Sequence, residues 1–272
     1  MQVYIPTRGR VGLDRQLTLR QFTKLSRRVP ILVCGPEEVE EHLCYHSKVL
    51  VCPVKGIAFK RQWILENSTA DIVVMADDDL RFDYRPDPLV CRLQVCTEID
   101  TALDWIPRCV KAGFIHGGMG PRRGNPLQGV FPVLDGIGYQ DVSRVTNFHF
   151  FDRKAVLATG VRFDTISREQ QFYFTMEDFY MTLSLLTRGF PNRIIQSYVW
   201  GQAGSGTKGG CSLYRTHESQ TNSAHALHAV FPQYVKVIEK SVKVGTGTWK
   251  GMETRTDVKI GWARAYRDSI NG

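Results

Sequence analysis

The stretch DIVVMADDDLRF, residues 71–82, decides the fold of this sequence. Its apolar run, Ile72 to Met75, is typical of a short strand that is buried on both faces of a sheet. Three aspartates, residues 77–79, follow directly. Ligands of open parallel sheets bind outside the carboxyl ends of the strands, so acids here indicate a binding site. The alternative is a solvated acidic turn, but adjacent carboxylates repel one another and favour a cation beside them.

Strand and helix signals alternate along the first part of the chain. Strands are predicted at 2–6, 30–34, 48–52 and 71–76, and helices at 13–26 and 57–67. This alternation predicts an α/β fold with a mostly parallel central sheet and helices on its faces. The later signals are a Gly-rich loop at 116–128, a hairpin around 128–138, a strand at 144–151, a helix at 176–188 and a strand at 192–200. A single domain over residues 1–272 is the simplest interpretation.

The composition indicates a basic protein without membrane segments. The 272 residues carry a formal net charge of +8 at pH 7. Two zones, residues 8–28 and 236–267, are rich in lysine and arginine, and each is either a solvated face or a surface for a polyanion. Because the sequence shows neither a signal peptide nor a run of ~20 apolar residues, we expect a cytoplasmic location and no membrane attachment.

Arg61 has an unusual position for a charged residue. A helix over residues 57–67 places it on the same face as Ile64 and Leu65, toward the sheet. A charge on this face needs a partner. Either the guanidinium pairs with a structural carboxylate or it reaches the aspartates and a diphosphate at the strand end, and we favour the second interpretation.

A second helix, predicted at 176–188, begins with two acids. Thr175 is expected to be its N-cap and Gly189 its C-terminal stop, so Glu177 and Asp178 belong to the first turn. Acids in a first turn stabilise the helix dipole and need no further role.

In their order along the chain, these motifs resemble the GT-A fold of nucleotide-sugar glycosyltransferases, a Rossmann-like α/β fold. The acidic Asp-x-Asp motif of that family matches Asp77 and Asp79, and its helix-borne acidic pair matches Glu177 and Asp178. The resemblance covers roughly residues 1–202. It implies a mostly parallel sheet and a smaller acceptor-side β/loop region, with a nucleotide-sugar half, an acceptor half and a basic C-terminal extension at 1–112, 113–231 and 232–272.

The resemblance also implies roles for individual residues. The donor, most simply a UDP-sugar, would be bound by Pro6, Thr7, Arg8, Arg10, Arg61, Asp77 and Asp78. Asp77 and Asp79 would hold Mn²⁺ or Mg²⁺, which stabilises the departing diphosphate. Asp178, with Glu177 beside it, would be the general base of an inverting transfer, although a retaining transfer stays possible from the sequence.

The chain departs from the family at the third metal ligand. Many relatives have a histidine after the strand that follows the acidic helix, where this chain has Gln202. The candidates to replace it are His217, His225 and His228, of which His217 is preferred. Residues 203–210 would form a lid that brings Lys208 to the diphosphate, or else a linker.

The acceptor is inferred from charge and from overall likeness. Residues expected to contact it are Gly118, Arg122, Arg123 and Arg144. A compact basic chain of this kind is similar to the glycosyltransferases that modify hydroxymethylated pyrimidines in DNA, including the base J glucosyltransferase and its phage relatives. This likeness implies double-stranded DNA as a partner, the host cytoplasm as the location of a phage-encoded protein, and no obligate protein partner. An aromatic residue could hold a flipped base, with Phe148, Phe172 and Tyr173 as candidates.

Two other functions are compatible with the same residues. One is transfer to a glycan or small molecule by an enzyme whose surface is incidentally basic. The other is a catalytically silent DNA-binding protein on the same scaffold, for which the acidic motif would have no use.

Overall fold

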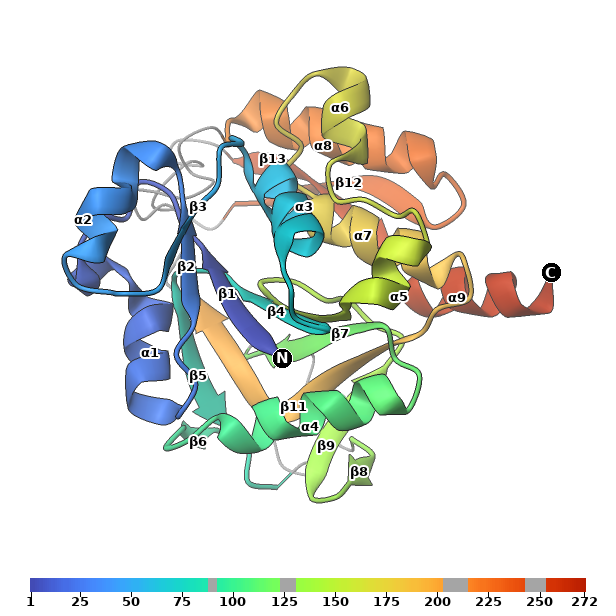
Figure 1. Cartoon of the computed structure of the whole chain (residues 1–272). Helices are drawn as coiled ribbons and strands as arrows, with labels where there is room; N and C mark the ends of the chain where they lie inside the picture. Colours follow the sequence, from blue (N-terminus) through green and yellow to red (C-terminus); the bar gives the residue numbers. More distant parts are fainter. Residues whose placement is uncertain (88–91, 123–130, 203–214, 243–252) are drawn as a thin grey trace.

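A sheet of eleven strands crosses the molecule, with helices packed on both of its faces (Figure 1). The computed structural model describes residues 1–87, 92–122, 131–202, 215–242 and 253–272. Along the sheet the strands are β3 (Val49–Val51), β2 (Ile31–Cys34), β1 (Gln2–Pro6), β4 (Ile72–Ala76), β10 (Phe148–Asp152), β7 (His116–Pro121), β11 (Asn192–Gln202), β5 (Leu80–Tyr84) and β6 (Gln94–Val95). The short strands β8 (Val133–Leu134) and β9 (Ile137–Asp141) pair with each other, and β9 also pairs with β11.

The direction of the strands confirms the mixed α/β class with a mostly parallel sheet. Strands β3, β2, β1 and β4 are parallel neighbours, and β7 and β11 are parallel to each other. Strands β10, β9 and β5 run in the opposite direction to their neighbours. The chain moves outward from β1 to β3 and then returns to place β4 on the other side of β1. The carboxyl ends of β1 and β4 therefore flank the point where the strand order reverses, where ligands bind in open α/β sheets.

Alternation along β4 explains how both faces are covered. Val74 and Ala76 pack with α1 (Leu17–Leu25) and α4 (Asp100–Lys111), which lie on one face. Val73 and Met75 pack with the helices of the other face, α3 (Ile57–Asn67), α5 (Arg153–Ala158) and α7 (Glu177–Leu186). A strand that is buried on both sides needs an unbroken apolar sequence, as residues 72–76 have.

Most of the elements predicted from the sequence are present. The predicted strand at 2–6 is β1, the helix at 57–67 is α3, and the strand at 192–200 is the first part of β11. The predicted helix at 13–26 is instead a 3₁₀ turn, η1 (Leu13–Arg15), followed by α1. The N-cap of α7 is Met176 and not Thr175, because the Thr175 side chain is buried and bonds to Ser223 (Oγ1 to Oγ, 3.2 Å).

The predicted Gly-rich loop at 116–128 is wrong over its first six residues, which form the central strand β7. A Cβ atom on Gly117 would lie 2.1 Å from the carbonyl oxygen of Arg193, and one on Gly118 would lie 2.2 Å from that of Phe148. The glycines therefore allow the neighbouring strands to approach β7 closely. Sequence patterns associate glycine with loops, so this strand was missed.

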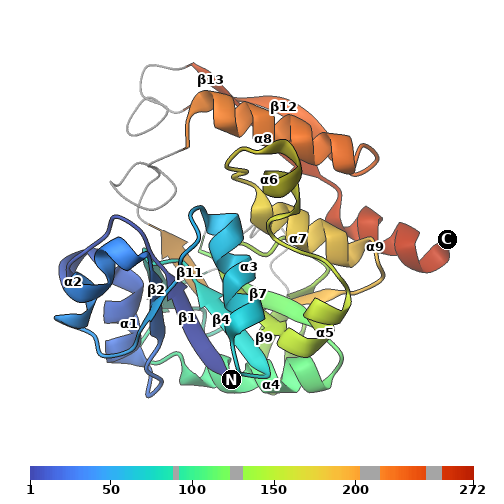
Figure 2. The same ribbon diagram turned by 45° about the horizontal axis from the view of Figure 1, so that its top comes forward.

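The C-terminal residues build a separate layer beyond α7. Helix α8 (His217–Val230) packs on α7 and against a two-stranded ribbon of β12 (Val235–Ser241) and β13 (Thr254–Ile260). The last helix, α9 (Trp262–Asn271), packs against α7 and extends away from the side that carries α1 and α2 (Figures 1 and 2). The remaining short elements are η2 (Pro36–Glu38), α2 (Val39–Leu43) and α6 (Thr165–Gln170). Within the described ranges, the helices are all too short or too polar to cross a membrane.

Replacing Gly118 with alanine should destabilise the protein by about 3 kcal/mol or more, because the added methyl group overpacks a strand that has neighbours on both sides. Urea unfolding followed by circular dichroism measures the loss. Gly201→Ala in β11 is the control, since its Cβ atom would lie no closer than 3.4 Å to the flexible side chain of Arg122. Equal stability of the two variants would contradict the packing described for β7.

Candidate functional site

The site begins where β1 and β4 end. Thr7, directly after β1, donates a hydrogen bond from Oγ1 to Oδ2 of Asp78 (2.6 Å). The backbone of the aspartate turn is held from α1, because Thr18 bonds to the carbonyl oxygens of Asp77 and Asp78 and accepts the amide proton of Leu80. The turn is thus fixed on both sides, so its side chains have defined directions.

Asp78 and Asp79 share one guanidinium. Arg10 pairs with Oδ1 of Asp78 and with Oδ2 of Asp79 (3.0 Å). The side-chain amide of Gln202 donates to both oxygens of Asp79, at 2.9 and 3.1 Å. Burial raises the pKa of Asp78 to about 7 although Arg10 opposes the shift, and burial also raises the pKa of Asp79. These carboxyls therefore favour taking up a proton or a further cation.

Asp77 has a different cation. The buried Arg61 donates from one nitrogen to Asp77 (2.7 Å) and from another to Glu177 at the start of α7 (2.9 Å). Burial would lower the pKa of Arg61, but Asp77, Glu177 and Asp178 raise it, so the guanidinium stays charged. Asn147, whose left-handed backbone (φ 62°) turns its side chain into the site, donates to the other oxygen of Asp77 (2.8 Å). Arg61 thus reaches the aspartates as the favoured prediction stated, and it also pairs with a buried carboxylate.

Glu177 and Asp178 complete the acidic cluster from the first turn of α7. Burial raises the pKa of both carboxyls, against the opposing effect of Arg61. Asp178 accepts a hydrogen bond from the amide N–H of Phe179 (2.9 Å). The charge of the exposed Arg144, like that of Arg61, lowers the pKa of Asp178. Of the two acids Asp178 is the more accessible, which suits a group that exchanges a proton with a bound molecule.

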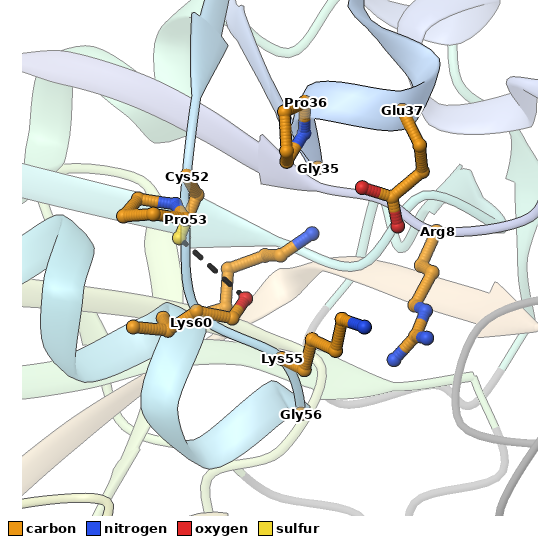
Figure 3. A pocket seen from close by; sticks show the side chains of 10 residues that line it. Arg8, Gly35, Pro36, Glu37, Cys52, Pro53, Lys55, Gly56 and Lys60 are labelled. Atoms are coloured by element: carbon orange, nitrogen blue, oxygen red, sulfur yellow. Dashed lines mark hydrogen bonds between the residues drawn. The ribbon is translucent and has the colours of Figure 1, made fainter.

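A basic pocket lies next to the acidic cluster, at the carboxyl ends of β1, β2 and β3. Its lining includes Arg8, Glu37, Lys55 and Lys60 together with Gly35, Pro36, Cys52, Pro53, Val54 and Gly56 (Figure 3). The ammonium of Lys60 donates to the carbonyl oxygens of Thr7 (2.6 Å) and Val33 (3.3 Å). Thr7 therefore touches both parts of the site, with Lys60 on one side and Asp78 on the other. The pocket offers cations to an anionic ligand, and the cluster offers carboxylates.

The charges of the cluster fit a divalent cation. Two guanidiniums bond to four carboxylates, Arg10 to Asp78 and Asp79 and Arg61 to Asp77 and Glu177, and a fifth carboxylate, Asp178, lies close enough for Arg61 to lower its pKa. Carboxylate oxygens are the ligands that Mg²⁺ and Mn²⁺ prefer. In the part of the chain that is described, however, no group of three His, Cys, Asp or Glu side chains is arranged to hold a metal ion, and the predicted set of Asp77, Asp79 and His217 is not brought together. The reason is that Asp77 and Asp79 bond to different partners, while His217 is exposed at the start of α8.

The other predicted ligand residues lie in varied surroundings. His225 is exposed on α8, and His228 bonds to the carbonyl oxygen of Val235 (2.7 Å), so the one has a surface position and the other a structural contact. Pro6 is the buried last residue of β1. Lys208 and Arg123 lie outside the described residues.

The predicted acceptor residues that the structure describes have different surroundings. Gly118 is enclosed within β7 and cannot contact a ligand from there, which corrects its assignment. Arg122 lies at the end of β7 with its Nε atom 3.4 Å from Asp83. Phe148 is fully buried in the core and cannot stack on a base, whereas Tyr173 is 41% exposed and lies against Gly56 at the basic pocket.

Several site residues were not predicted from the sequence. Gln16 links Thr7 to the backbone of Arg10 (2.8 and 2.7 Å), and Asn147 and Lys60 also fix the site. A signal was available for Lys60, since its spacing of three residues from Ile57 and four from Ile64 places it on the helix face turned toward the sheet, where it is buried. Beneath the site, His116 and His149 are stacked with Phe151, and burial holds the pKa of His116 at about 3.

Comparison with solved structures identifies the fold. Glucosyl-3-phosphoglycerate synthase from Mycobacterium tuberculosis, solved with Mg²⁺ and uridine diphosphate, matches 93% of this chain and 89% of its own at 13% identity, with a TM-score of 0.50. The same enzyme with Mn²⁺, uridine diphosphate and glucosyl-3-phosphoglycerate gives 14% identity over 93% and 88%, with a TM-score of 0.48. At such identity the likeness shows the fold, and it confirms the predicted GT-A architecture.

TarS from S. aureus, solved with UDP, is a more distant match. It aligns with 84% of this chain at 13% identity and a TM-score of 0.40, and this chain spans 66% of the TarS chain. No protein-family model and no curated protein sequence matches.

Replacing Arg61 with methionine should cost about 3–5 kcal/mol of stability, because Glu177 then loses its cation and is left either as an uncompensated buried charge or as a carboxyl that must take up a proton. The double variant Arg61→Met/Glu177→Met should regain most of this loss, since no buried charge is left on that side. Urea unfolding of the single and double variants gives the coupling energy. Arg108→Met, which removes an exposed pair with Asp135, is the control and should change stability by less than about 1 kcal/mol. An Arg61→Met variant with an unchanged free energy of unfolding would contradict the role described for the bridge.

Proposed function

We propose that this chain is a metal-dependent glycosyltransferase that moves a sugar from a UDP-sugar to the hydroxyl group of a hydroxymethylated pyrimidine in double-stranded DNA. The observation that carries the proposal is the bridge of Arg61 between Asp77 and Glu177. This bridge joins an Asp-rich turn at the switch point of a GT-A fold to an acidic helix start. In this proposal residues 1–112 bind the donor and residues 113–231 bind the acceptor.

The basic pocket and the acidic cluster suit the two ends of a nucleotide sugar. In the pocket, the side chains of Arg8 and Lys55 extend toward the same side, where a nucleoside diphosphate would present its charge (Figure 3). Tyr173 beside Gly56 offers an aromatic surface at the rim of this pocket. The mycobacterial synthase, which has this fold, has been solved with uridine diphosphate and Mg²⁺. These features support a UDP-sugar donor.

A bound divalent cation, held by Asp77 and Asp79, would offset the negative charge that builds up on the departing diphosphate. The chain's own residues prepare the acceptor. Asp178 accepts a hydrogen bond from the acceptor hydroxyl and takes its proton while the oxygen bonds to the anomeric carbon. The bond from that carbon to the diphosphate breaks, and the diphosphate leaves with the electron pair. Arg61 holds Glu177, and with it the start of α7, in position for this transfer.

Charge supports DNA as the acceptor. The formal net charge is +8, and the exposed Arg144 lies close enough to Asp178 to affect its pKa. A cation beside the general base would contact a phosphate of the acceptor strand without itself reacting. Transfer to a glycan or a small molecule uses the same donor site and differs only in this contact.

The test is a transfer assay. The purified protein is incubated with Mn²⁺ or Mg²⁺, a panel of UDP-sugars and duplex DNA that contains 5-hydroxymethylcytosine or 5-hydroxymethyluracil, and the digested nucleosides are weighed by mass spectrometry. We expect one modified nucleoside to gain the mass of a sugar, and EDTA to abolish the gain. Release of UDP without a change in the DNA would move the acceptor to a glycan or small molecule. If no donor yields either a modified nucleoside or free UDP, the proposal is wrong.

Asp178→Asn should lower kcat/KM for transfer by about 100-fold or more and leave UDP binding unchanged, because the amide cannot take a proton. Isothermal titration with UDP measures binding separately from turnover. Asp104→Asn, on the outer surface of α4, is the matched control and should keep full activity.

The pH profile gives an independent readout of the same residue. Burial raises the pKa of Asp178, so the wild-type kcat/KM should rise with pH through a pKa above that of an ordinary aspartate. The residual activity of Asp178→Asn should lack this acid limb. An unchanged limb would assign the base to another group.

A further inference from the structure

The ribbon of β12 and β13 has one covered face and one open face. Val235, Val237, Val258 and Ile260 belong to the core that α8 shares, and Thr256 bonds to Gln220 and Thr221 of that helix. Side chains alternate along a strand, so the residues between these point to the other side. In Figure 2 the ribbon lies at the periphery of the molecule, beyond α8 as seen from the main sheet.

The open face carries four cations in two directly opposed pairs. Lys236 is paired in register with Lys259, and Lys240 with Arg255. The third cross-strand pair on this face, between them, is Ile238 with Asp257. The two pairs of cations are four residues apart along each strand, which corresponds to about 13 Å.

The charges on this face are only partly balanced. The carboxylate of Asp257 accepts from both Lys240 (3.1 Å) and Arg255 (3.2 Å). For Lys236 and Lys259, both exposed, the described part of the chain supplies no ion-pair partner. Like charges directly opposite each other destabilise a two-stranded ribbon. A surface that has this arrangement gains stability when an anion binds across it.

We propose that the open face of the β12–β13 ribbon binds the sugar-phosphate backbone of duplex DNA, with the two pairs of cations contacting phosphates on opposite sides of one groove. The major groove of B-DNA is about 12 Å wide and admits a two-stranded ribbon, which agrees with the distance of about 13 Å between the pairs. The proposal names a docking surface outside the catalytic cluster, and its choice of DNA rests on the acceptor in the proposed function.

The chemistry of the face favours nucleic acid over a membrane surface. Ile238 is the one apolar side chain that it presents in the described strands, whereas an element that inserts into a bilayer interface needs a broad apolar face. Backbone contacts of this kind are independent of sequence and position the protein on the duplex. The ribbon is connected to the start of α7 through the packing of α8, so a bound duplex has a fixed relation to Asp178.

The test compares duplex binding by two double variants. Fluorescence anisotropy with a short labelled duplex is measured between about 50 and 200 mM salt, the range over which phosphate contacts lose much of their strength. Lys236→Gln/Lys259→Gln should weaken binding on the order of tenfold at low salt and reduce the slope of log K against log salt by about 2. Lys111→Gln/Lys154→Gln, an equal charge change on exposed residues of α4 and α5, should leave the slope unchanged.

Stability separates loss of binding from loss of folding. The ribbon variant should melt at or above the temperature of the wild type, because it removes a repulsive cross-strand pair. Equal loss of affinity in both double variants, or no loss in the ribbon variant, would overturn the inference. Binding to phosphatidylserine vesicles without binding to DNA would overturn it as well.

The same experiments distinguish this inference from the proposed function. Ribbon-dependent duplex binding by a protein that transfers no sugar to modified DNA would keep the docking surface and reject the DNA glycosyltransferase. Transfer to modified DNA that is unaffected by Lys236→Gln/Lys259→Gln would keep the enzyme and reject the docking surface.

Discussion

The site depends on one buried guanidinium. Arg61 comes from α3 and Asp77 from the end of β4, the next element of the chain, whereas Glu177 at the start of α7 is 116 residues away from Arg61. Each partner would be destabilised by burial if it lacked the other, because a desolvated charge without a counter-ion is among the most unfavourable groups in a protein core. The bridge therefore joins the start of α7 to the end of β4, and it brings Glu177 and Asp178 beside the aspartate turn.

The cluster keeps an excess of negative charge in spite of this bridge. Arg10 is shared by two aspartates, and Gln202 and Asn147 provide neutral donors to the same turn. Neutral donors orient carboxylates without cancelling their charge. The basic pocket on the other side of Thr7 has the opposite character. A ligand that is anionic in its middle and binds a metal there is complementary to both, as a nucleoside diphosphate sugar is.

Much of this arrangement follows from local sequence, and the exceptions have physical causes. The apolar run before Asp77 predicted β4, and helical spacing predicted that Arg61 faces the sheet. The partner of Arg61 on α7 could not be predicted by spacing, since more than a hundred residues separate them. β7 was missed because its glycines are required by the close approach of β10 and β11, a tertiary constraint that has no local signal. Gln16 and Asn147 contribute single hydrogen bonds, which leave no periodic pattern.

The stacked histidines beneath the site affect how folding is coupled to protons. Burial keeps His116 and His149 neutral, so the unfolded chain binds more protons than the native state once the pH falls below about 6.5. This coupling destabilises the fold in acid by up to about 1.4 kcal/mol per pH unit for each histidine. Asp78 and Glu177 act with the opposite sign, because their raised pKa values let the native state hold protons that the unfolded chain releases between about pH 4 and 7. The two effects have opposite signs, so they partly offset each other in this range. A bound cation that keeps these carboxylates ionised removes the effect that opposes the histidines. The protein with the cation bound therefore loses stability more steeply in acid than the protein without it.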